Sequence, residues 1–219
     1  MSDMANMTPA QAWREMRDGN DRFVNGEPKH PSQGIDDRNR LTGGQTPKAV
    51  LFGCSDSRVA AEIVFDQGLG DLFVVRTAGQ AIDSAVLGSI EFAVAVLKVS
   101  LIAVLGHDSC GAVGATIKAV DEAQIPGGYI RDVVEKVTPS VLAGKAEGLT
   151  RVDEFEARHV QETTKLLTER SRIIADAIEA GELGIVGLTY SLAEGRAWLR
   201  EVVGEVSDQP DTDHALPSV

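Results

Sequence analysis

Short apolar segments separated by helix-like stretches most constrain how this chain can fold. Runs of this kind occupy residues 48–52, 72–75, 101–105 and 183–190, and the segments between them carry helical patterns. Strands that alternate with helices form βαβ units, in which the strands run parallel and the crossovers are right-handed. The sequence therefore predicts an α/β fold, with a mostly parallel central sheet of four to five strands flanked by helices.

The length and composition indicate a single domain over residues 1–204, since 219 residues with 43% hydrophobic content suffice for one sizeable core. An N-terminal arm of about residues 1–47 is expected, with a helix from Thr8 to about Val24 followed by a polar stretch. Residues 205–219 hold two prolines, three aspartates and few apolar residues. This composition predicts a disordered C-terminal tail.

Two further elements are predicted after residue 150. A helix is expected from about residue 150 to about residue 180, because apolar residues recur along it at helical spacing. Residues 196–203 read as an edge strand, although a terminal helix is the alternative. The predicted fold class is the same in both cases.

Charge and hydropathy exclude several classes of partner. The net charge is −12 and the pI is about 4.8, so polyanions such as nucleic acids and anionic membranes would be repelled. No run approaches the roughly 18 apolar residues of a membrane span. The first ten residues are polar and lack the apolar region of a secretory signal. We expect a soluble cytoplasmic protein whose partners are small molecules and its own copies.

The two cysteines of the chain lie in short motifs that follow apolar runs. Gly53-Cys54-Ser55-Asp56-Ser57-Arg58 follows the first run, and His107-Asp108-Ser109-Cys110-Gly111 follows the third. Loops after parallel strands emerge at one edge of a sheet, so both motifs are expected to meet there. Thiolate and imidazole are zinc ligands, and three protein ligands leave a fourth position open. The pattern predicts a catalytic zinc site.

Other interpretations of the cysteines stay open at this point. Both could be small core side chains, and a disulfide is disfavoured by the reducing compartment. A Cys–His nucleophile pair explains neither the second cysteine nor Asp56 and Arg58 beside the first. A non-catalytic structural zinc or thiol-sensing module is also possible, with Asp56 as the fourth ligand.

These motifs resemble those of the bacterial β-class carbonic anhydrases, which show C-x-D-x-R and H-x-x-C. The resemblance implies one zinc ion per chain held by Cys54, His107 and Cys110, with Asp56 and Arg58 as the catalytic pair. It implies reversible hydration of carbon dioxide to bicarbonate and a proton by zinc-bound hydroxide. In one group of the family the aspartate itself caps the zinc, so Asp56 is a conditional fourth ligand at low pH. Hydrolysis of carbon disulfide or carbonyl sulfide at the same site is an alternative.

The resemblance also implies a substrate pocket formed by Gln45, Phe73, Ala78, Phe92 and Gly111. In the family, the glutamine and the aromatic near Phe92 come from a neighbouring subunit, which implies a dimer or tetramer. Ala78 stands where a valine is usual and Phe92 where a tyrosine is usual. Both are apolar, so a reshaped pocket for carbon dioxide is expected.

The inhibitory bicarbonate pocket of the capped group is less well matched. Gly53 and Tyr190 agree with it, but Leu51 occupies the position of a tryptophan. His159 and His30 lie outside the motifs and are candidate proton relays. His159 is predicted on a polar helix face and His30 in a proline-flanked loop, and both are expected to be solvated surface residues, with buffer or water carrying the proton.

Overall fold

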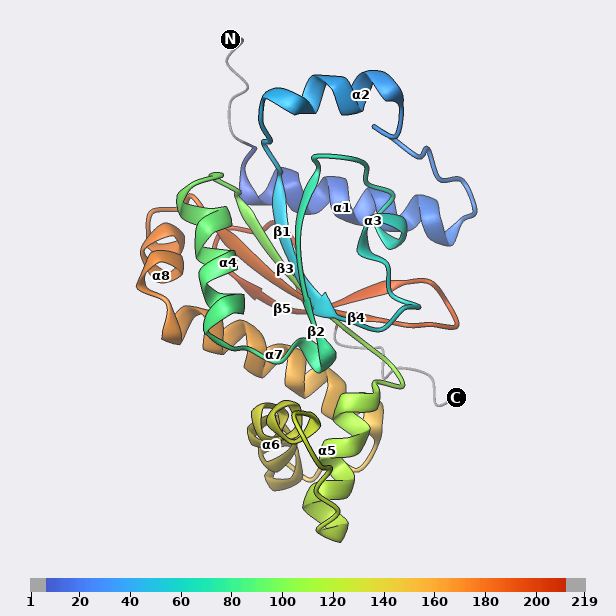
Figure 1. Cartoon of the computed structure of the whole chain (residues 1–219), viewed down its shortest axis with the longest axis vertical. Coiled ribbons are helices and arrows are strands. Elements are labelled where there is room, and N and C mark those ends of the chain that lie inside the picture. Colours follow the sequence, from blue (N-terminus) through green and yellow to red (C-terminus); the bar gives the residue numbers. More distant parts are fainter. Residues whose placement is uncertain (1–6, 212–219) are drawn as a thin grey trace.

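The computed structural model describes residues 7–211, and within that range the chain forms one five-stranded sheet with helices on both faces (Figure 1). The strands lie in the order β2-β1-β3-β4-β5. They are β1 (Ala49–Cys54), β2 (Leu72–Thr77), β3 (Leu101–His107), β4 (Gly184–Tyr190) and β5 (Ala197–Val203). The helices are α1 (Pro9–Val24), α2 (Ile35–Arg40), α3 (Ala61–Val64), α4 (Ser84–Ala95), α5 (Gly111–Glu122), α6 (Ile130–Ala146), α7 (Val152–Arg170) and α8 (Arg172–Glu179), with short 3₁₀ turns η1 (Leu41–Gly43) and η2 (Ala78–Gln80).

The first four strands pair in parallel and β5 pairs antiparallel with β4. The predicted mostly parallel α/β sheet is therefore confirmed, and the segment for which a terminal helix was the alternative forms the edge strand β5. Parallel alignment brings the carboxyl ends of neighbouring strands to one edge. In the β1–β3 pair, Gly53 lies opposite Leu105.

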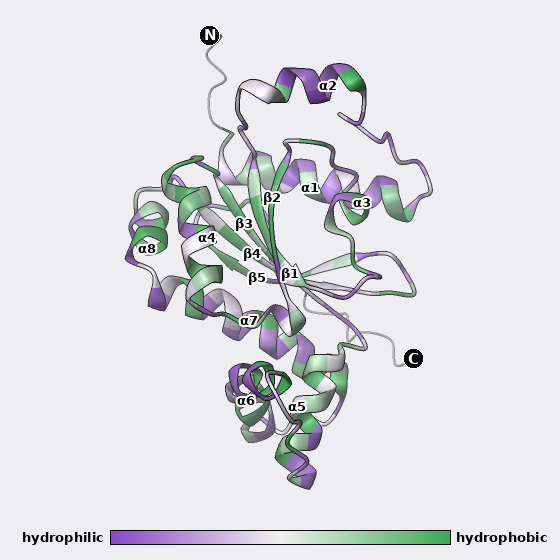
Figure 2. Cartoon of the chain, in the orientation of Figure 1, coloured by the Kyte–Doolittle hydropathy of each residue, from purple (hydrophilic) through white to green (hydrophobic). Residues whose placement is uncertain are grey.

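Two apolar layers cover the sheet because alternate residues of a strand point to opposite faces. In β3, Leu101, Ala103 and Leu105 pack in the layer that includes α1 and α3, whereas Ile102 and Val104 pack in the layer of α4, α7 and α8. Strands β1, β3 and β4 are buried along their whole length. Figure 2 shows the matching hydrophobic colour in the centre of the sheet. This burial explains why these strands read as continuous apolar runs.

The N-terminal arm contains the predicted helix and one that the sequence did not predict. Thr8 Oγ1 accepts the Gln11 amide hydrogen at 3.2 Å and Gln11 Oε1 accepts that of Thr8 at 2.9 Å, a capping box that begins α1. The polar stretch after it includes α2, whose six residues are too few to show a helical period. None of the described helices is long and apolar enough to span a membrane.

The single helix predicted from about residue 150 to about residue 180 is wrong, because the chain forms α7 and α8 with a break at Ser171. The backbone of Ser171 is extended, at φ −121° and ψ 112°. Its Oγ accepts the Ile174 amide hydrogen at 3.2 Å and so caps α8. Apolar residues continue at helical spacing on both sides of this serine. The sequence pattern therefore gave no sign of the break.

Residues 205–211 lie against the body of the protein. Asp208 accepts a hydrogen bond from Trp13 Nε1 of α1 at 2.6 Å, and the Asp211 amide donates to the Leu199 carbonyl of β5 at 2.8 Å. The described part of the predicted disordered tail is thus held by specific contacts. The rest of that tail, 212–219, lies outside the described residues, as does 1–6 of the predicted arm.

Candidate metal centre

Two strand ends and one helix start bring three metal-binding side chains together. Cys54 ends β1, His107 ends β3, and Cys110 directly precedes α5. Because β1 and β3 are parallel neighbours, these chain segments share one edge of the sheet. All three residues are buried and their ligand atoms lie within 4.8 Å of one another. The structure thus brings together the three side chains that the sequence singled out as ligands.

The cluster fits a tetrahedral metal ion. The two sulfur atoms are 4.0 Å apart, and zinc–sulfur bonds of about 2.3 Å would separate two thiolates by about 3.8 Å in a tetrahedron. His107 Nδ1 donates to the Asp108 carbonyl oxygen at 2.7 Å, which leaves the lone pair on Nε2. Among the described residues, this buried Nε2 has no hydrogen-bond partner. A metal ion would supply that partner.

The two thiols are unequal in acidity. The hydrogen bond from Cys110 lowers the pKa of the Cys54 thiol to about 4. The same contact, together with burial, raises the pKa of Cys110. Burial opposes a charge on His107, whereas the neighbouring Cys54 thiolate raises the pKa of its imidazole. The cluster therefore favours one negative sulfur on its own, and a divalent cation would favour the second.

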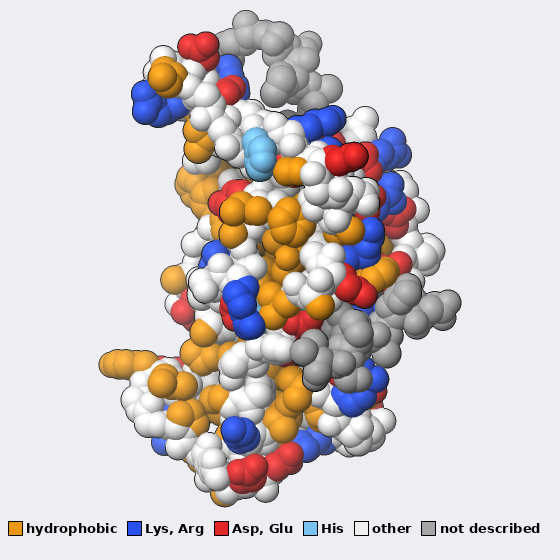
Figure 3. Space-filling view, turned by 90° about the vertical axis from the view of Figure 1, so that its right-hand side faces the viewer, with side chains coloured by type: hydrophobic (Ala, Val, Ile, Leu, Met, Phe, Trp, Pro, Cys, Tyr) orange, Lys and Arg blue, Asp and Glu red, His pale blue; other side chains and the backbone are white. Residues whose placement is uncertain are grey.

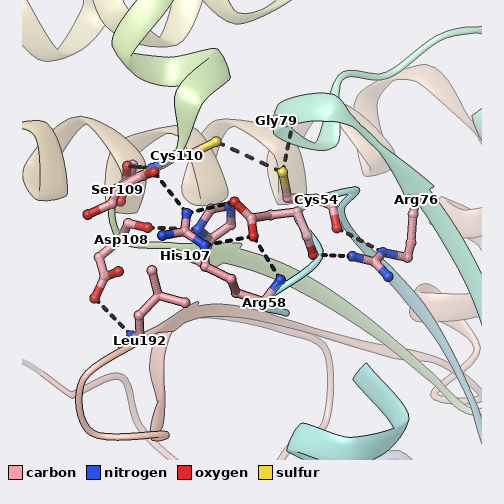
Figure 4. A network of polar contacts seen from close by, with 11 residues as sticks. Cys54, Arg58, Arg76, Gly79, His107, Asp108, Ser109, Cys110 and Leu192 are labelled. Carbon is pink, nitrogen blue, oxygen red and sulfur yellow. Dashed lines mark hydrogen bonds and ion pairs between the residues drawn. The ribbon is translucent and has the colours of Figure 1, made fainter. Parts of the chain in front are cut away.

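The Asp56–Arg58 pair borders this cluster. Arg58 Nε donates to Asp56 Oδ1 at 2.9 Å and Arg58 Nη2 donates to Oδ2 at 2.7 Å. These hydrogen bonds hold the pKa of the Asp56 carboxyl well below its usual range. Asp56 Oδ2 is also 3.9 Å from His107 Nε2. Arg76 braces the loop by donating to the carbonyl oxygens of Cys54 at 2.8 Å and Asp56 at 2.6 Å (Figure 4).

Two of the five expected pocket residues lie beside the cluster in the same chain. Ala78 begins η2 directly after β2, whose last residue, Thr77, pairs with Cys54. Gly111 follows Cys110, and the space that a Cβ would occupy at this glycine is open. A small side chain at each position leaves room next to the candidate ligands.

The other three expected pocket residues lie away from the cluster of their own chain. Gln45 precedes β1 and Cys54 ends it, so five residues of that strand, at about 3.3 Å each, stand between them. Phe73 lies four residues before the end of β2, about 13 Å along the strand. Its ring centroid is 6.2 Å from that of Phe92, which is 46% exposed. In a single chain Gln45 and Phe92 are exposed, whereas Phe73 is partly buried against the core.

Two polar residues of α7 are buried, which the sequence did not predict. Glu156 Oε1 accepts the Cys110 amide hydrogen at 2.7 Å, and burial raises the pKa of the Glu156 carboxyl to about 8. His159 was predicted on a solvated helix face, and that prediction is wrong because the residue is only 4% exposed. Its ring nitrogens contact Ser140 Oγ and the Gly79 carbonyl oxygen, each at 2.8 Å.

Helical spacing was the signal that would have found them. Phe155 and Val160 are buried apolar residues of this helix, and Glu156 and His159 lie beside them on the same face at spacings of three and four residues. His30, by contrast, is exposed, as expected.

Comparisons with known proteins agree on one family. The family model described as carbonic anhydrase matches residues 49–197. Carbonic anhydrase 2 of Mycobacterium tuberculosis is 61% identical over 206 residues, which cover 94% of this chain and 100% of the relative. The carbonic anhydrase of Mycolicibacterium smegmatis is 62% identical over 205 residues, with 94% and 100% covered. A structure from work on two tetrameric β-carbonic anhydrases of Sordaria macrospora matches with a TM-score of 0.66 and 26% identity, covering 74% of this chain and 84% of that one.

Proposed function

This chain is an enzyme of the β-carbonic anhydrase family, and we propose that it interconverts carbon dioxide and bicarbonate with one zinc ion per chain, held by Cys54, His107 and Cys110. The observation that carries this proposal is the geometry of the cluster. Two thiols 4.0 Å apart lie beside an imidazole nitrogen that is buried and, among the described residues, lacks a hydrogen-bond partner. That donor set suits zinc.

Zinc bound there would supply an acidified water molecule as the nucleophile toward carbon dioxide. Two thiolates and a neutral imidazole cancel the charge of a divalent ion, whereas three neutral imidazoles leave both charges in place. The ligands of this chain therefore acidify a water molecule less than three histidines would. We expect activity to rise on the alkaline side of neutrality.

Asp56 and Arg58 act as a pair in the proposed reaction. The Asp56 carboxylate, which borders the cluster, accepts a hydrogen bond from the reacting water and fixes its orientation. Arg58 bonds both carboxylate oxygens and so keeps Asp56 ionised and directed. Ala78 and Gly111 leave space beside this pair for a small substrate.

A second role of Asp56 is a gate at low pH. In the structure the carboxylate bonds Arg58 while Oδ2 lies 3.9 Å from His107 Nε2. Neutral water is a weaker metal ligand than a carboxylate, so at low pH Asp56 would leave Arg58 and take the fourth position at the metal. At high pH the carboxylate would return to Arg58 and the site would open.

Self-association completes the site in this proposal. Gln45, Phe73 and Phe92 do not reach the cluster of their own chain, so Gln45 and Phe92 would serve the site of a neighbouring subunit in a dimer or tetramer. Figure 3 shows hydrophobic side chains gathered in patches on one face of the molecule. Large hydrophobic side chains that are exposed in the single chain include Ile35, Ile63, Leu69, Phe92 and Val96. Burial between subunits would remove them from water.

The ligand chemistry favours a reducing compartment. Two adjacent thiols must stay reduced to bind a metal, and reducing conditions are those of the cytoplasm. We therefore place the enzyme there.

The direct test is stopped-flow measurement of carbon dioxide hydration on protein whose zinc content has been measured. Wild type should be active with zinc, and Cys110→Ser should lose both the activity and the full equivalent of zinc. A full equivalent of zinc in the Cys110→Ser protein would contradict the ligand assignment.

A further inference from the structure

His159 of α7 is buried with a partner for each ring nitrogen. Nδ1 lies 2.8 Å from Ser140 Oγ of α6, and Nε2 lies 2.8 Å from the Gly79 carbonyl oxygen of η2. A carbonyl oxygen only accepts hydrogen bonds, so Nε2 carries the hydrogen and donates it. Burial lowers the pKa of His159 and keeps the ring neutral. Nδ1 therefore accepts the Ser140 hydroxyl hydrogen, and Ser140 fixes the tautomer that His159 needs.

Gly79 links this contact to the metal cluster. Its carbonyl oxygen accepts from His159, and its amide donates to Cys54 Sγ at 3.3 Å. Figure 4 shows the Cys54 sulfur in contact with both Gly79 and Cys110. The φ angle of Gly79 is +59°, and a Cβ there would lie 2.6 Å from that of Ala112. Both the positive φ and the close approach to Ala112 favour glycine at this position. The hydrogen bond to Cys54 therefore comes from the backbone, because residue 79 has no side chain.

We propose that His159 and Ser140 are positioning residues for Cys54, an inference that rests on the zinc site of the proposed function. His159 bonds the Gly79 carbonyl, which is joined through the Gly79 Cα to the amide that donates to Cys54, and so holds this backbone with the amide hydrogen on the Cys54 sulfur. A hydrogen bond withdraws electron density from a thiolate, so the sulfur donates less charge to a bound cation and the cation stays more electrophilic.

The polarity of position 159 supports this role. A hydrophobic side chain would fill the same buried space without the cost of desolvating an imidazole. The histidine is stable there because both nitrogens are bonded, and one of those bonds ends at the residue that contacts the Cys54 sulfur. Ser140 is also buried, at 2% exposure, which shields the chain of contacts from competing water.

Cobalt(II) is a suitable probe because thiolate-to-cobalt charge-transfer absorption reports electron donation by the sulfur. His159→Phe keeps a ring but removes both hydrogen bonds, His159→Gln retains an amide donor, and Ser140→Ala removes only the hydroxyl. Thr164→Val is the matched control. Thr164 is a buried polar residue of the same helix whose hydroxyl donates to the Gln161 carbonyl oxygen, away from η2.

The His159→Phe protein should show its sulfur-to-cobalt band at longer wavelength at one cobalt per chain. Ser140→Ala should shift the band less in the same direction, and His159→Gln should return it toward the wild-type position. Thr164→Val should leave it unchanged.

An unchanged band in the His159 and Ser140 variants at full cobalt loading would overturn the positioning role. If His159→Phe fails to fold, the bands of Ser140→Ala and His159→Gln decide the question in the same way. Hydration of carbon dioxide by the zinc-loaded wild type separates the two proposals. A shifted band in a protein that does not hydrate carbon dioxide supports the positioning role and overturns the proposed function, whereas a wild type that binds no cobalt overturns both.

Discussion

Arg58 bonds both carboxylate oxygens of Asp56, although one of those oxygens lies only 3.9 Å from His107 Nε2. The carboxylate therefore has two cationic partners within reach, the guanidinium and any metal ion held by the cluster. Small changes in the charge at the cluster can then decide where Asp56 binds.

Replacing Arg58 by Ala should shift the activity profile to higher pH. Without the guanidinium, the pKa of Asp56 returns toward its usual range and the carboxylate loses its alternative to the metal. A higher hydroxide concentration is then needed to displace it. The measurement is kcat/KM for carbon dioxide hydration as a function of pH, with zinc content confirmed at each pH. A profile that falls in height without moving along the pH axis would contradict the gate.

The gate also predicts a change in the metal's ligands with pH. Zinc-edge absorption spectra at about pH 6.5 should show two sulfurs, one nitrogen and a carboxylate oxygen, and spectra at about pH 8.5 should show the carboxylate replaced. The Asp56→Asn protein is the control, since a neutral amide is a poorer ligand for the metal. If no carboxylate is found at either pH, ordinary ionisation of water accounts for any pH dependence.

Glu156 should make the metal-free protein less stable as pH rises. Burial raises the pKa of this carboxyl from 4.5 to about 8 in the folded state. Its contribution is complete below pH 4.5 and is lost between there and about pH 8, because only the unfolded chain releases the proton in that window. Glu156→Gln removes the titration. The free energy of unfolding of the variant, relative to wild type, should therefore rise by up to about 1.4 kcal/mol per pH unit.

Urea unfolding of both metal-free proteins at about pH 5.5 and about pH 7.5 measures this difference. Both proteins keep Cys54, His107 and Cys110, so the two chains differ only in the Glu156 carboxyl. The same difference at both pH values would show that the Glu156 carboxyl does not hold its proton in the folded protein.

Two inactive variants should complement each other if Gln45 serves the neighbouring subunit. Gln45→Ala keeps the zinc ligands, and Cys110→Ser keeps the glutamine. Each hybrid dimer then contains one complete site, so co-expression at equal levels should restore about a quarter of the wild-type sites by random pairing. Activity no greater than the sum of the separate variants would show that Gln45 acts within its own chain or not at all.

The sheet and the metal cluster could be predicted because their signals are local. Strands buried on both faces appear as apolar runs, and the two cysteines follow two of those runs within motifs of six and five residues. The break at Ser171 was missed because it does not interrupt the helical spacing of the apolar residues around it. Helix α2 was missed because its six residues are too few to show a helical period.

Helical spacing indicates that Glu156 and His159 are buried, but their polar contacts could not be predicted in the same way. Glu156 accepts a hydrogen bond from the Cys110 amide, and His159 contacts the Gly79 carbonyl and Ser140, and these partners lie far away in the sequence. Such partners arise only when α7 packs against the loops at the end of the sheet. From the sequence alone, polar residues of a helix are assigned to its solvent-exposed face, because most polar residues are exposed.

The central claim is that Cys54, His107 and Cys110 hold the zinc ion that makes this chain a carbonic anhydrase, and titration of zinc into the metal-free enzyme tests it most directly. The rate of carbon dioxide hydration should rise in proportion to bound zinc and reach a plateau at one ion per chain, with no activity at zero zinc and none in Cys110→Ser at equal zinc concentration. Full activity in the metal-free protein, or no activity at one zinc per chain, would contradict the account.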